Sequence, residues 1–317
     1  MNGSARPSAL GYQENMASGN ETIEVGARSI EVSNLGKVFY PDAGITKGDV
    51  INYYRAVALV LLPHLKGRPI TLKRYPNGVN GPFFYEKECP SHRPKWIKTA
   101  AITRRQDGKA VNYCVLNDEA ALVWAANLAD LELHTSLAVG RNVERPQTMV
   151  FDLDPGAPAG LVECCRIALV LKAMLDSADL AGFAKTSGSK GMQIFVPLHT
   201  PTNYEDTKAF AQAFARILEE ERPDETISKP SREARRGKVF VDWSQNDRHK
   251  TTVSVYSLRA RPRPTVSTPV TWDEVADAAA GDQEMLVFEH NQTLERIEAH
   301  GDLFEPVLTT RQRLPKI

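Results

Sequence analysis

The segment Val150–Gly156, Val-Phe-Asp-Leu-Asp-Pro-Gly, constrains the fold and the chemistry of this chain more than any other. Its apolar and acidic residues alternate, which predicts a β-strand in which residues two apart share a face. Asp152 and Asp154 are therefore expected side by side, while Phe151 and Leu153 face a core. The Pro-Gly pair that follows ends the strand, so we expect the two carboxylates at an edge that a ligand can reach.

Two neighbouring carboxylates repel each other unless a cation lies between them, and hard divalent ions prefer oxygen ligands. A lone Asp-x-Asp is also typical of a solvated strand end before a turn. A third acid favours a metal site, because Asp242 lies in an apolar segment where an unpaired carboxylate is costly. We expect Asp152, Asp154 and Asp242 to hold two divalent ions, Mn²⁺ or Mg²⁺, for a phosphoryl displacement.

The loop Thr186–Gly191, Thr-Ser-Gly-Ser-Lys-Gly, combines small residues with one lysine. Free backbone amides, hydroxyls and an ammonium can together bind phosphate. The loop is not a P-loop, since its spacing differs and a strand follows it in place of a helix. Such turns are common in hairpins, but beside an acidic pair this one predicts a nucleoside triphosphate site.

Charge is unevenly distributed along a chain whose formal net charge is zero. Residues 37–109 carry 14 Lys and Arg against 5 Asp and Glu, and residues 229–263 carry 10 against 3. Residues 271–306 carry 1 against 10. Solvated helix faces can produce part of this pattern, but it favours a basic working face for a polyanion beside an acidic flank.

The four cysteines show no Cys-x-x-Cys spacing, so no zinc site is indicated. We expect Cys89, Cys114, Cys164 and Cys165 to be small core residues in a reducing compartment. The longest apolar runs are too short to span a bilayer. Residues 1–21 are polar and resemble a disordered leader, not a secretion signal. We therefore expect a cytoplasmic protein that does not bind membranes.

Helical and strand patterns are mixed without a regular βαβ order, which favours an α+β fold. A helix is expected to begin at Thr46, with Asp49 as its capping partner, and to end at Pro63, and a second one is expected to begin at Asn117. Further helices are expected at 161–175 and 204–220, and strands at 22–32, 70–74, 239–243 and 251–258. Residues 183–198 are expected to form a strand, a turn of small residues and a second strand.

Three short segments resemble, in their order along the chain, the motifs of the archaeo-eukaryotic primase superfamily. They are Asp-Leu-Asp-Pro-Gly, Lys-Thr-Ser-Gly-Ser-Lys-Gly and Val-Asp-Trp-Ser-Gln-Asn. The chain from about Ile30 to Pro315 most resembles the polymerase domain of bacterial ligase D, which acts in non-homologous end joining with Ku. Further matching segments are Ser33–Pro41, Gly44–Asp49, Thr71–Gly78, Glu132–His134, Tyr256–Arg261 and Thr268–Trp272.

The resemblance implies that residues 22–317 form one primase-polymerase domain with a mixed or antiparallel central sheet flanked by helices. It implies a template-directed nucleotidyltransferase that uses NTPs or dNTPs, prefers ribonucleotides, tolerates manganese and fills short gaps in DNA. Its partners would be gapped or end-joined DNA with a 5′-phosphate, together with Ku and a DNA ligase in a bacterial cytoplasm.

The resemblance also assigns roles to single residues. Asp152, Asp154 and Asp242 would form the catalytic metal site. Lys37 and Lys47 would bind the 5′-phosphate across a gap, and Arg235 would help to place the primer end. The residues that would bind the nucleotide are Lys73, Arg74, Phe84, His134, Ser187, Lys190, Gln193 and Arg259.

One position departs from the family pattern. The second motif usually has His on the strand after the loop, and Gln193 stands there in this chain. Glutamine keeps an amide donor but carries no positive charge, so we expect an effect on turnover more than on fold.

Two other functions remain open at the level of sequence. A manganese-dependent glycosyltransferase also uses Asp-x-Asp with a nucleotide-sugar, although a third carboxylate and two basic segments argue against it. A non-catalytic module that bridges DNA ends is the other alternative, and the three intact aspartates argue against that one.

Overall fold

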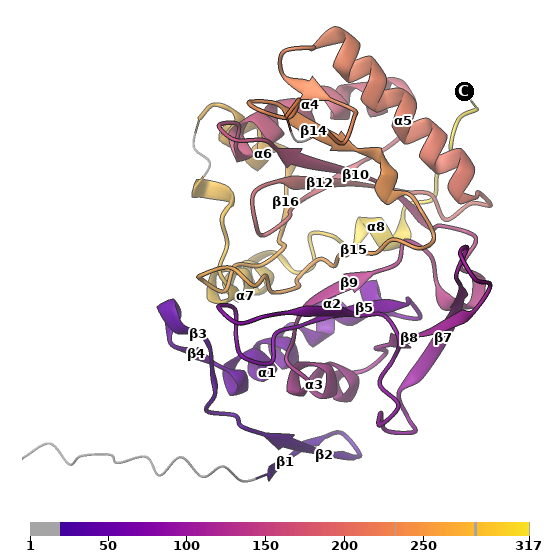
Figure 1. The fold of residues 1–317 in the computed structure, drawn as a ribbon. Coiled ribbons are helices and arrows are strands. Elements are labelled where there is room, and N and C mark those ends of the chain that lie inside the picture. Colours follow the sequence, from indigo (N-terminus) through magenta and orange to yellow (C-terminus); the bar gives the residue numbers. More distant parts are fainter. Residues whose placement is uncertain (1–19, 232, 282–283, 317) are drawn as a thin grey trace, which may run out of the picture.

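The computed structural model describes residues 20–231, 233–281 and 284–316. Two six-stranded sheets lie one above the other, with helices on their outer sides (Figure 1). The expected α+β class with mixed or antiparallel strands and flanking helices is confirmed. The architecture adds a second large sheet where we expected one central sheet.

The upper sheet in Figure 1, which we call the aspartate sheet, carries the predicted metal-binding residues. Its strand pairs are antiparallel except the pair between the first two strands. Its order is β13 (Thr226–Ile227), β14 (Val239–Asp242), β10 (Thr148–Pro155), β12 (Met192–Pro197), β11 (Phe183–Thr186) and β16 (Pro269–Val270). The helices above it are α4 (Leu161–Ser177), α5 (Tyr204–Glu221) and α6 (Trp272–Ala279).

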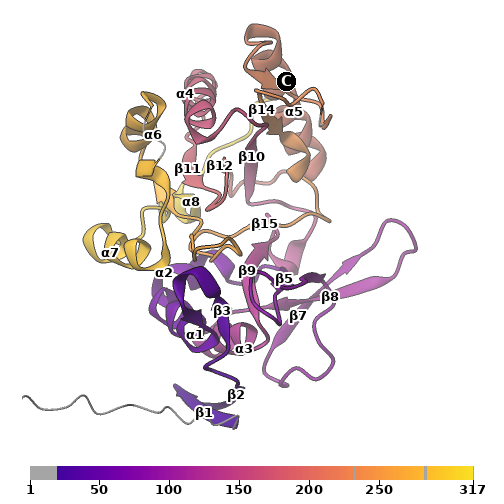
Figure 2. The same cartoon turned by 60° about the vertical axis from the view of Figure 1, so that its left-hand side comes forward.

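The lower sheet, which we call the glutamate sheet, is built from the N-terminal half of the chain and one later strand. Its order is β15 (Thr252–Val253), β9 (Asp130–Thr135), β5 (Ile70–Arg74), β8 (Ala110–Val115) and β7 (Lys98–Thr103), with β6 (Phe84–Glu86) paired to β5. The helices below it are α1 (Lys47–Ala56), α2 (Ala58–Leu65) and α3 (Glu119–Asn127). The hairpin of β7 and β8 projects from the body (Figure 2).

Smaller elements complete the described part of the chain. The hairpins are β1 (Asn20–Val25) with β2 (Arg28–Ser33) and β3 (Val38–Tyr40) with β4 (Ile45–Thr46). The C-terminal helices are α7 (His290–His300) and α8 (Pro306–Thr309). Short 3-10 turns are η1 (Pro41–Ala43), η2 (Gly140–Asn142), η3 (Trp243–Gln245) and η4 (Glu284–Leu286).

Buried and more exposed residues alternate at Phe151–Asp154 of β10, as the sequence predicts. Phe151 and Leu153 are fully buried in the core between the aspartate sheet and its helices. Val150 belongs to the other core, toward the glutamate sheet, and Asp152 shares its face because it lies two residues on. One face of the strand thus packs against the helices, and the other face carries the carboxylates.

The expected helix from Thr46 to Pro63 is correct at its start and wrong at its end. Thr46 and Asp49 form the predicted capping box, but the helix breaks at Val57 and resumes as α2 with Pro63 inside it. Proline removes the hydrogen bond to the carbonyl four residues earlier. That carbonyl belongs to Leu59, which is 88% exposed, so water can replace the lost bond.

Three further expectations need correction. Asp118, not Asn117, caps α3, because its side chain accepts a hydrogen bond from Ala121 N while Asn117 Oδ1 accepts one from Gly67 N. The single strand at 22–32 is a hairpin that turns at Gly26, where φ is +57°. Of the expected strand at 251–258, only Thr252 and Val253 form a β-strand, which is β15.

The expected leader, residues 1–21, overlaps the first strand. Residues 1–19 lie outside the described residues, while β1 begins at Asn20. No helix in the described ranges is long and apolar enough to cross a membrane.

The prediction that all four cysteines are free is wrong for two of them. Cys89 and Cys114 form a disulfide. The loop after β6 lies against β8, where Cys89 N donates a hydrogen bond to Asn112 O, and this contact brings together thiols that are 25 residues apart. Cys164 and Cys165 are free and buried in α4, as expected.

Candidate active site

A cavity of about 580 Å³ opens between the two sheets. It brings together seven of the residues that the sequence singled out. The aspartate sheet and its loop contribute Asp152, Asp154, Ser187, Lys190 and Gln193, and the opposite side contributes His134 and Arg259. Both basic segments reach its wall, through Lys87 and through Lys250, Arg259 and Arg261.

Asp152 lies in a row of polar residues that crosses four strands of the aspartate sheet. Strand register pairs Asp152 with Asp242 on β14 and with Gln193 on β12. Gln193 is paired in turn with Lys185 on β11. Because directly opposed residues point to the same face, the row presents ammonium, amide and two carboxylates in sequence.

The surroundings of the Asp152 carboxyl disfavour its negative charge. Burial, together with the nearby charges of Asp242 and Asp154, raises its pKa to about 6. Gln193 and Lys185 oppose the increase without cancelling it. The repulsion among these carboxylates is what a bound cation would relieve.

The other two carboxylates are engaged by donors of the chain itself. Asp154 Oδ2 accepts a hydrogen bond from Arg235 Nη1 at 2.9 Å. Asp242 accepts from Ser244 N at 2.9 Å and from Gln245 Nε2 at 3.0 Å. As they stand, no three His, Cys, Asp or Glu side chains among the described residues converge closely enough to hold an ion.

The donor set nevertheless fits a hard divalent ion. It consists of carboxylate oxygens only, on one face of one sheet, and their like charges repel. Asp154 Oδ2 is engaged by Arg235, whose guanidinium lies 3.9 Å from the centre of the Phe240 ring, while Asp154 Oδ1 accepts no hydrogen bond from the described residues. The assignment of Asp152, Asp154 and Asp242 to metal stays a prediction.

The loop between β11 and β12 is closed on itself. Ser187 Oγ accepts hydrogen bonds from Ser189 N at 3.2 Å and Gly191 N at 3.1 Å, so these amides are not free for phosphate. Lys190 is exposed and makes no ion pair within the described part of the chain. Of the predicted pair, Lys190 is therefore better placed than Ser187 to contact an anion.

Gly191 explains how this loop lies so close to the carboxylates. A Cβ atom at this position would come within 2.0 Å of the Leu153 carbonyl oxygen. Only glycine allows the loop to pack against the end of β10 between Asp152 and Asp154.

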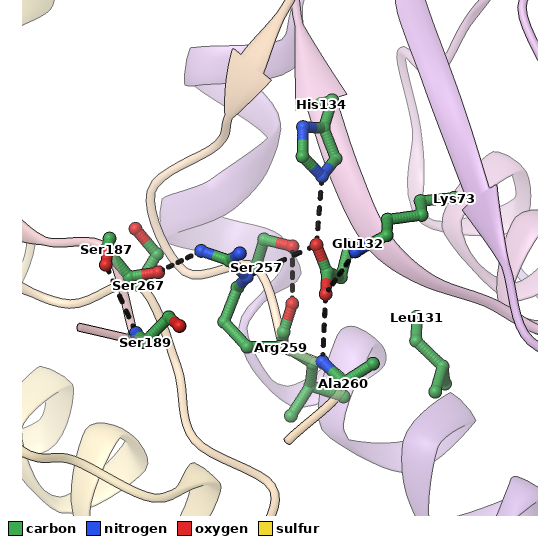
Figure 3. Close-up of polar contacts among 12 residues, drawn as sticks. Lys73, Leu131, Glu132, His134, Ser187, Ser189, Ser257, Arg259, Ala260 and Ser267 are labelled. Carbon is green, nitrogen blue, oxygen red and sulfur yellow. Dashed lines mark hydrogen bonds and ion pairs between the residues drawn. The ribbon is translucent and has the colours of Figure 1, made fainter. Parts of the chain in front are cut away.

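Glu132 on β9 lies behind the opposite wall and contacts side chains that line it (Figure 3). It is 1% exposed, and its carboxylate accepts hydrogen bonds from Lys73 Nζ at 3.1 Å and Ala260 N at 3.0 Å. His134 Nε2 lies at 3.0 Å and Arg259 Nε at 3.2 Å. Although burial acts to raise it, these neighbours hold the pKa of Glu132 well below its usual range.

Glu132 thus positions three of the predicted nucleotide-binding residues. Arg259 bridges the two sheets, because its guanidinium also donates to Ser187 O. Sequence analysis did not assign a role to Glu132. The signal was present in Glu-Leu-His, in which residues two apart share a face as they do in Asp-Leu-Asp.

Lys73, Arg74 and Phe84 do not line this cavity. Lys73 is held behind it by Glu132, and Tyr85, its cross-strand partner on β6, lines the cavity in its place. Arg74 follows Lys73 on β5 and therefore points to the opposite face of the sheet. There it forms an ion pair with Glu86 at 2.8 Å and lies over the Phe84 ring. Their roles in nucleotide binding stay predictions.

Lys37 and Lys47 lie together, also outside the cavity. Lys47 N donates to Lys37 O at 2.8 Å. Lys47 Nζ donates to Ser33 O, and Lys37 Nζ donates to Asn77 Oδ1. Burial, with the positive charges of Lys37 and Arg74 nearby, lowers the pKa of Lys47 to about 8. Clustered cations suit a phosphate, but that role stays a prediction.

Comparison with known proteins identifies the family. Residues 46–304 match the model of the LigD primase-polymerase domain. The chain belongs to this family. A multifunctional non-homologous end joining protein LigD of Mycolicibacterium smegmatis is 38% identical over 280 residues, which are 88% of this chain and 36% of that protein. The bifunctional LigD of Bacillus subtilis is 29% identical over 86% of this chain and 43% of that protein.

A solved structure agrees with the family assignment. The polymerase domain of Mycobacterium tuberculosis ligase D, in complex with DNA, superposes with a TM-score of 0.82 at 35% sequence identity. The match covers 89% of this chain and 99% of that one. The chain spans little more than a third of the length of the curated LigD relatives, and all of a LigD polymerase domain.

Proposed function

We propose that this chain is a template-directed nucleotidyltransferase that extends DNA 3′ ends and fills short gaps during end joining. The observation that carries the proposal is that Asp152 and Asp154 share one cavity with two cations, Lys190 on the same side and Arg259 on the opposite side. Asp242 is paired with Asp152 in the aspartate sheet. Membership of the LigD primase-polymerase family supports the proposal. So does the likeness to a relative whose structure contains DNA.

In this proposal the cavity holds an incoming nucleoside triphosphate. Lys190 and Arg259 bind its phosphates, the first as a point charge and the second as a planar fork. Asp152, Asp154 and Asp242 would hold divalent ions, which when bound supply neutralisation of the charge that develops on the phosphoryl oxygens.

The reaction is a displacement at the α-phosphorus. The primer 3′ oxygen forms a bond to phosphorus, the bond to the bridging oxygen of pyrophosphate breaks, and the hydroxyl proton passes to solvent. Glu132 takes no part in bond making. It keeps His134 and Arg259 at fixed positions while the phosphates change geometry.

The finer features form part of the same proposal. We infer a preference for ribonucleotides, recognition of a 5′-phosphate by Lys37 and Lys47, and placement of the primer end by Arg235. The partners are gapped or end-joined DNA, Ku and a DNA ligase. The names of the LigD relatives, which are end-joining proteins, support the end-joining context of this proposal.

The proposal is tested by primer extension on a gapped duplex that carries a 5′-phosphate, with Mn²⁺ and Mg²⁺ in separate reactions. The wild-type chain is expected to add the nucleotide that the template specifies. D152A should slow addition at least about a hundredfold while DNA binding is retained. D176A, the same change at an exposed position on α4, is the matched control.

Three results would contradict the proposal. Wild-type-like extension by D152A would show that Asp152 is not part of a catalytic metal site. DNA binding by the wild type without any extension would favour the end-bridging module, and hydrolysis of a nucleotide-sugar without DNA would favour the glycosyltransferase.

A further inference from the structure

Lys185 on β11 is a buried ammonium for which the proposed mechanism has no use. Its side chain is fully buried at the end of the polar row that passes through Asp152. Its Nζ donates hydrogen bonds to Gln193 Oε1 and Ser267 Oγ, both at 2.6 Å. No carboxylate of the described residues lies within ion-pair distance of it, and an ammonium buried without a counter-charge is costly.

Ser267 fixes the position of this ammonium. Its hydroxyl donates to the Thr186 carbonyl at 2.8 Å, so its oxygen lone pairs face Lys185. The Lys185 ammonium also lies 5.5 Å from the centre of the Phe195 ring. The only residue of the polar row that Lys185 contacts by hydrogen bond is Gln193.

Gln193 faces Lys185 on one side and the cavity on the other. It is 3% exposed, and its Nε2 donates to Thr252 Oγ1 on β15 at 2.8 Å, which ties the aspartate sheet to the glutamate sheet. A side-chain amide has one accepting and one donating end, and rotation about its last bond exchanges them. Burial and the nearby positive charge of Arg259 lower the pKa of Lys185 well below its usual range. In its ammonium form lysine can only donate, so it fixes the amide with oxygen toward Lys185 and nitrogen toward Thr252 and Asp152.

We propose that Lys185 is a positioning residue for the nucleotide site, because it holds the Gln193 amide with its N–H groups turned toward Asp152 and the cavity. This inference rests on the proposed nucleotidyltransferase function. In the reversed orientation, the amide oxygen would face the Asp152 carboxylate and the triphosphate. Negative ends would then oppose one another in a buried place, where such repulsion is little screened.

The chemistry of residue 193 makes the role specific. A leucine at this position has no polar group, so it leaves Lys185 nothing to orient. Lys185 and Gln193 should therefore be energetically coupled, and the coupling should vanish in a Q193L background. A purely structural lysine would have the same effect in both backgrounds.

The test is single-turnover primer extension at varied nucleotide concentration for the wild type, K185M, Q193L and K185M/Q193L. K185M should raise the half-saturating nucleotide concentration by about tenfold, the size expected for one charge-assisted hydrogen bond, and change the maximal rate less. In the Q193L background, the same change should alter the half-saturating concentration less than about twofold. K172M, the same substitution on α4 at the opposite face of the sheet, should have no effect.

A second variant tests the claim from the other side. K185Q keeps an N–H donor for Gln193 Oε1 and removes the charge, so its half-saturating concentration should stay within about threefold of wild type. Thermal unfolding and direct nucleotide binding are measured for every variant. Binding must weaken in K185M without a matching loss of thermal stability.

Each other outcome overturns the inference. These are wild-type nucleotide use by K185M, an equal K185M effect in both backgrounds, or a tenfold loss in K185Q. If K185M does not fold, K185Q decides alone. Failure of the wild type to extend any primer is a different result, because it contradicts the proposed function itself.

Discussion

The two sheets each place an acid at or directly behind the wall of the same cavity, in opposite electrostatic states. Asp152 of the aspartate sheet lies near two further carboxylates, and its pKa is raised to about 6. Glu132 of the glutamate sheet contacts Lys73, His134 and Arg259, and its pKa is lowered despite its burial. Both residues belong to an acid-x-polar alternation on a strand. The motif therefore does not determine the role, because the neighbours on other strands do.

The difference separates two tasks. The charge of Glu132 is neutralised within the protein, where it orders cations that a nucleotide can use. Asp152 forms no ion pair with the described residues, which leaves its charge for a ligand that the chain does not supply. We accordingly expect changes at Glu132 to alter stability and nucleotide affinity, and changes at Asp152 to alter the chemical step and metal binding.

The largest effect on stability is expected for E132Q. Glutamine matches the shape of glutamate but leaves Lys73 and Arg259 as buried charges without their partner. Breaking a buried ion pair in this way costs about 3–5 kcal/mol in the free energy of unfolding. Denaturant unfolding measures it, with E220Q on the exposed face of α5 as a control expected within about 0.5 kcal/mol of wild type. A loss below about 1 kcal/mol for E132Q would show that Glu132 does not organise this wall.

The next effect concerns Lys190, the cation of the loop on the aspartate sheet. A charge-assisted contact is worth roughly 1.5–3 kcal/mol, so K190A should weaken nucleotide use by about ten- to a hundredfold. DNA affinity should hardly change. Nucleotide titrations and DNA binding measured on one preparation check this, with K66A as the control for loss of one exposed charge. Loss of DNA affinity with nucleotide affinity intact would place the loop against the duplex.

Asp152 predicts a pH dependence of the metal-free protein. Its pKa is about 6 in the fold against 3.8 ordinarily, so between these values the unfolded chain binds fewer protons than the folded one. The contribution of Asp152 to the free energy of unfolding should therefore fall as pH rises from about 4 to 6, by about 1–3 kcal/mol, and then level off.

D152N should remove this decrease and be more stable than wild type at pH 7 in the presence of a chelator. Mn²⁺ should then stabilise the wild type and not D152N. Denaturant unfolding across this pH range provides the measurement, with D176N as the exposed control. A D152N protein less stable than wild type at pH 7 would contradict the electrostatic account of the row.

The smallest effect is expected at the paired lysines outside the cavity. If Lys37 and Lys47 bind a 5′-phosphate, gapped DNA with that phosphate should bind the wild type several-fold more tightly than DNA without it, and the double alanine variant should lose the preference. The salt dependence of binding should also become shallower, because fewer counterions are released. An undiminished preference in the variant would refute the role.

Local patterns predicted the aspartate sheet well. Alternation in Val150–Gly156 fixed which residues of β10 are buried, and the small residues of Thr186–Gly191 marked the turn before β12. Asp242 was identified because an acid is costly in an apolar strand. These inferences needed only a residue and its neighbours in the chain.

The glutamate sheet was harder to predict, because its contacts join distant segments. Glu132 is 59 residues from Lys73 and 128 from Ala260, so no spacing rule links them. The Cys89–Cys114 disulfide was missed for a related reason. The contacts of Ser187 with two amides of its own loop are local, but a hydroxyl in such a loop can equally bind backbone amides or a ligand. Each depends on which of several available partners the fold brings close.

The division between the sheets is tested most directly by single-turnover extension at varied nucleotide concentration for D152N and E132Q, each below its unfolding transition. D152N should lower the maximal rate at least about a hundredfold, since it removes charge from the reacting centre. E132Q should raise the half-saturating nucleotide concentration about tenfold or more and leave the maximal rate within about threefold. The reverse pattern, with E132Q slowing the maximal rate at unchanged half-saturation, would contradict the account.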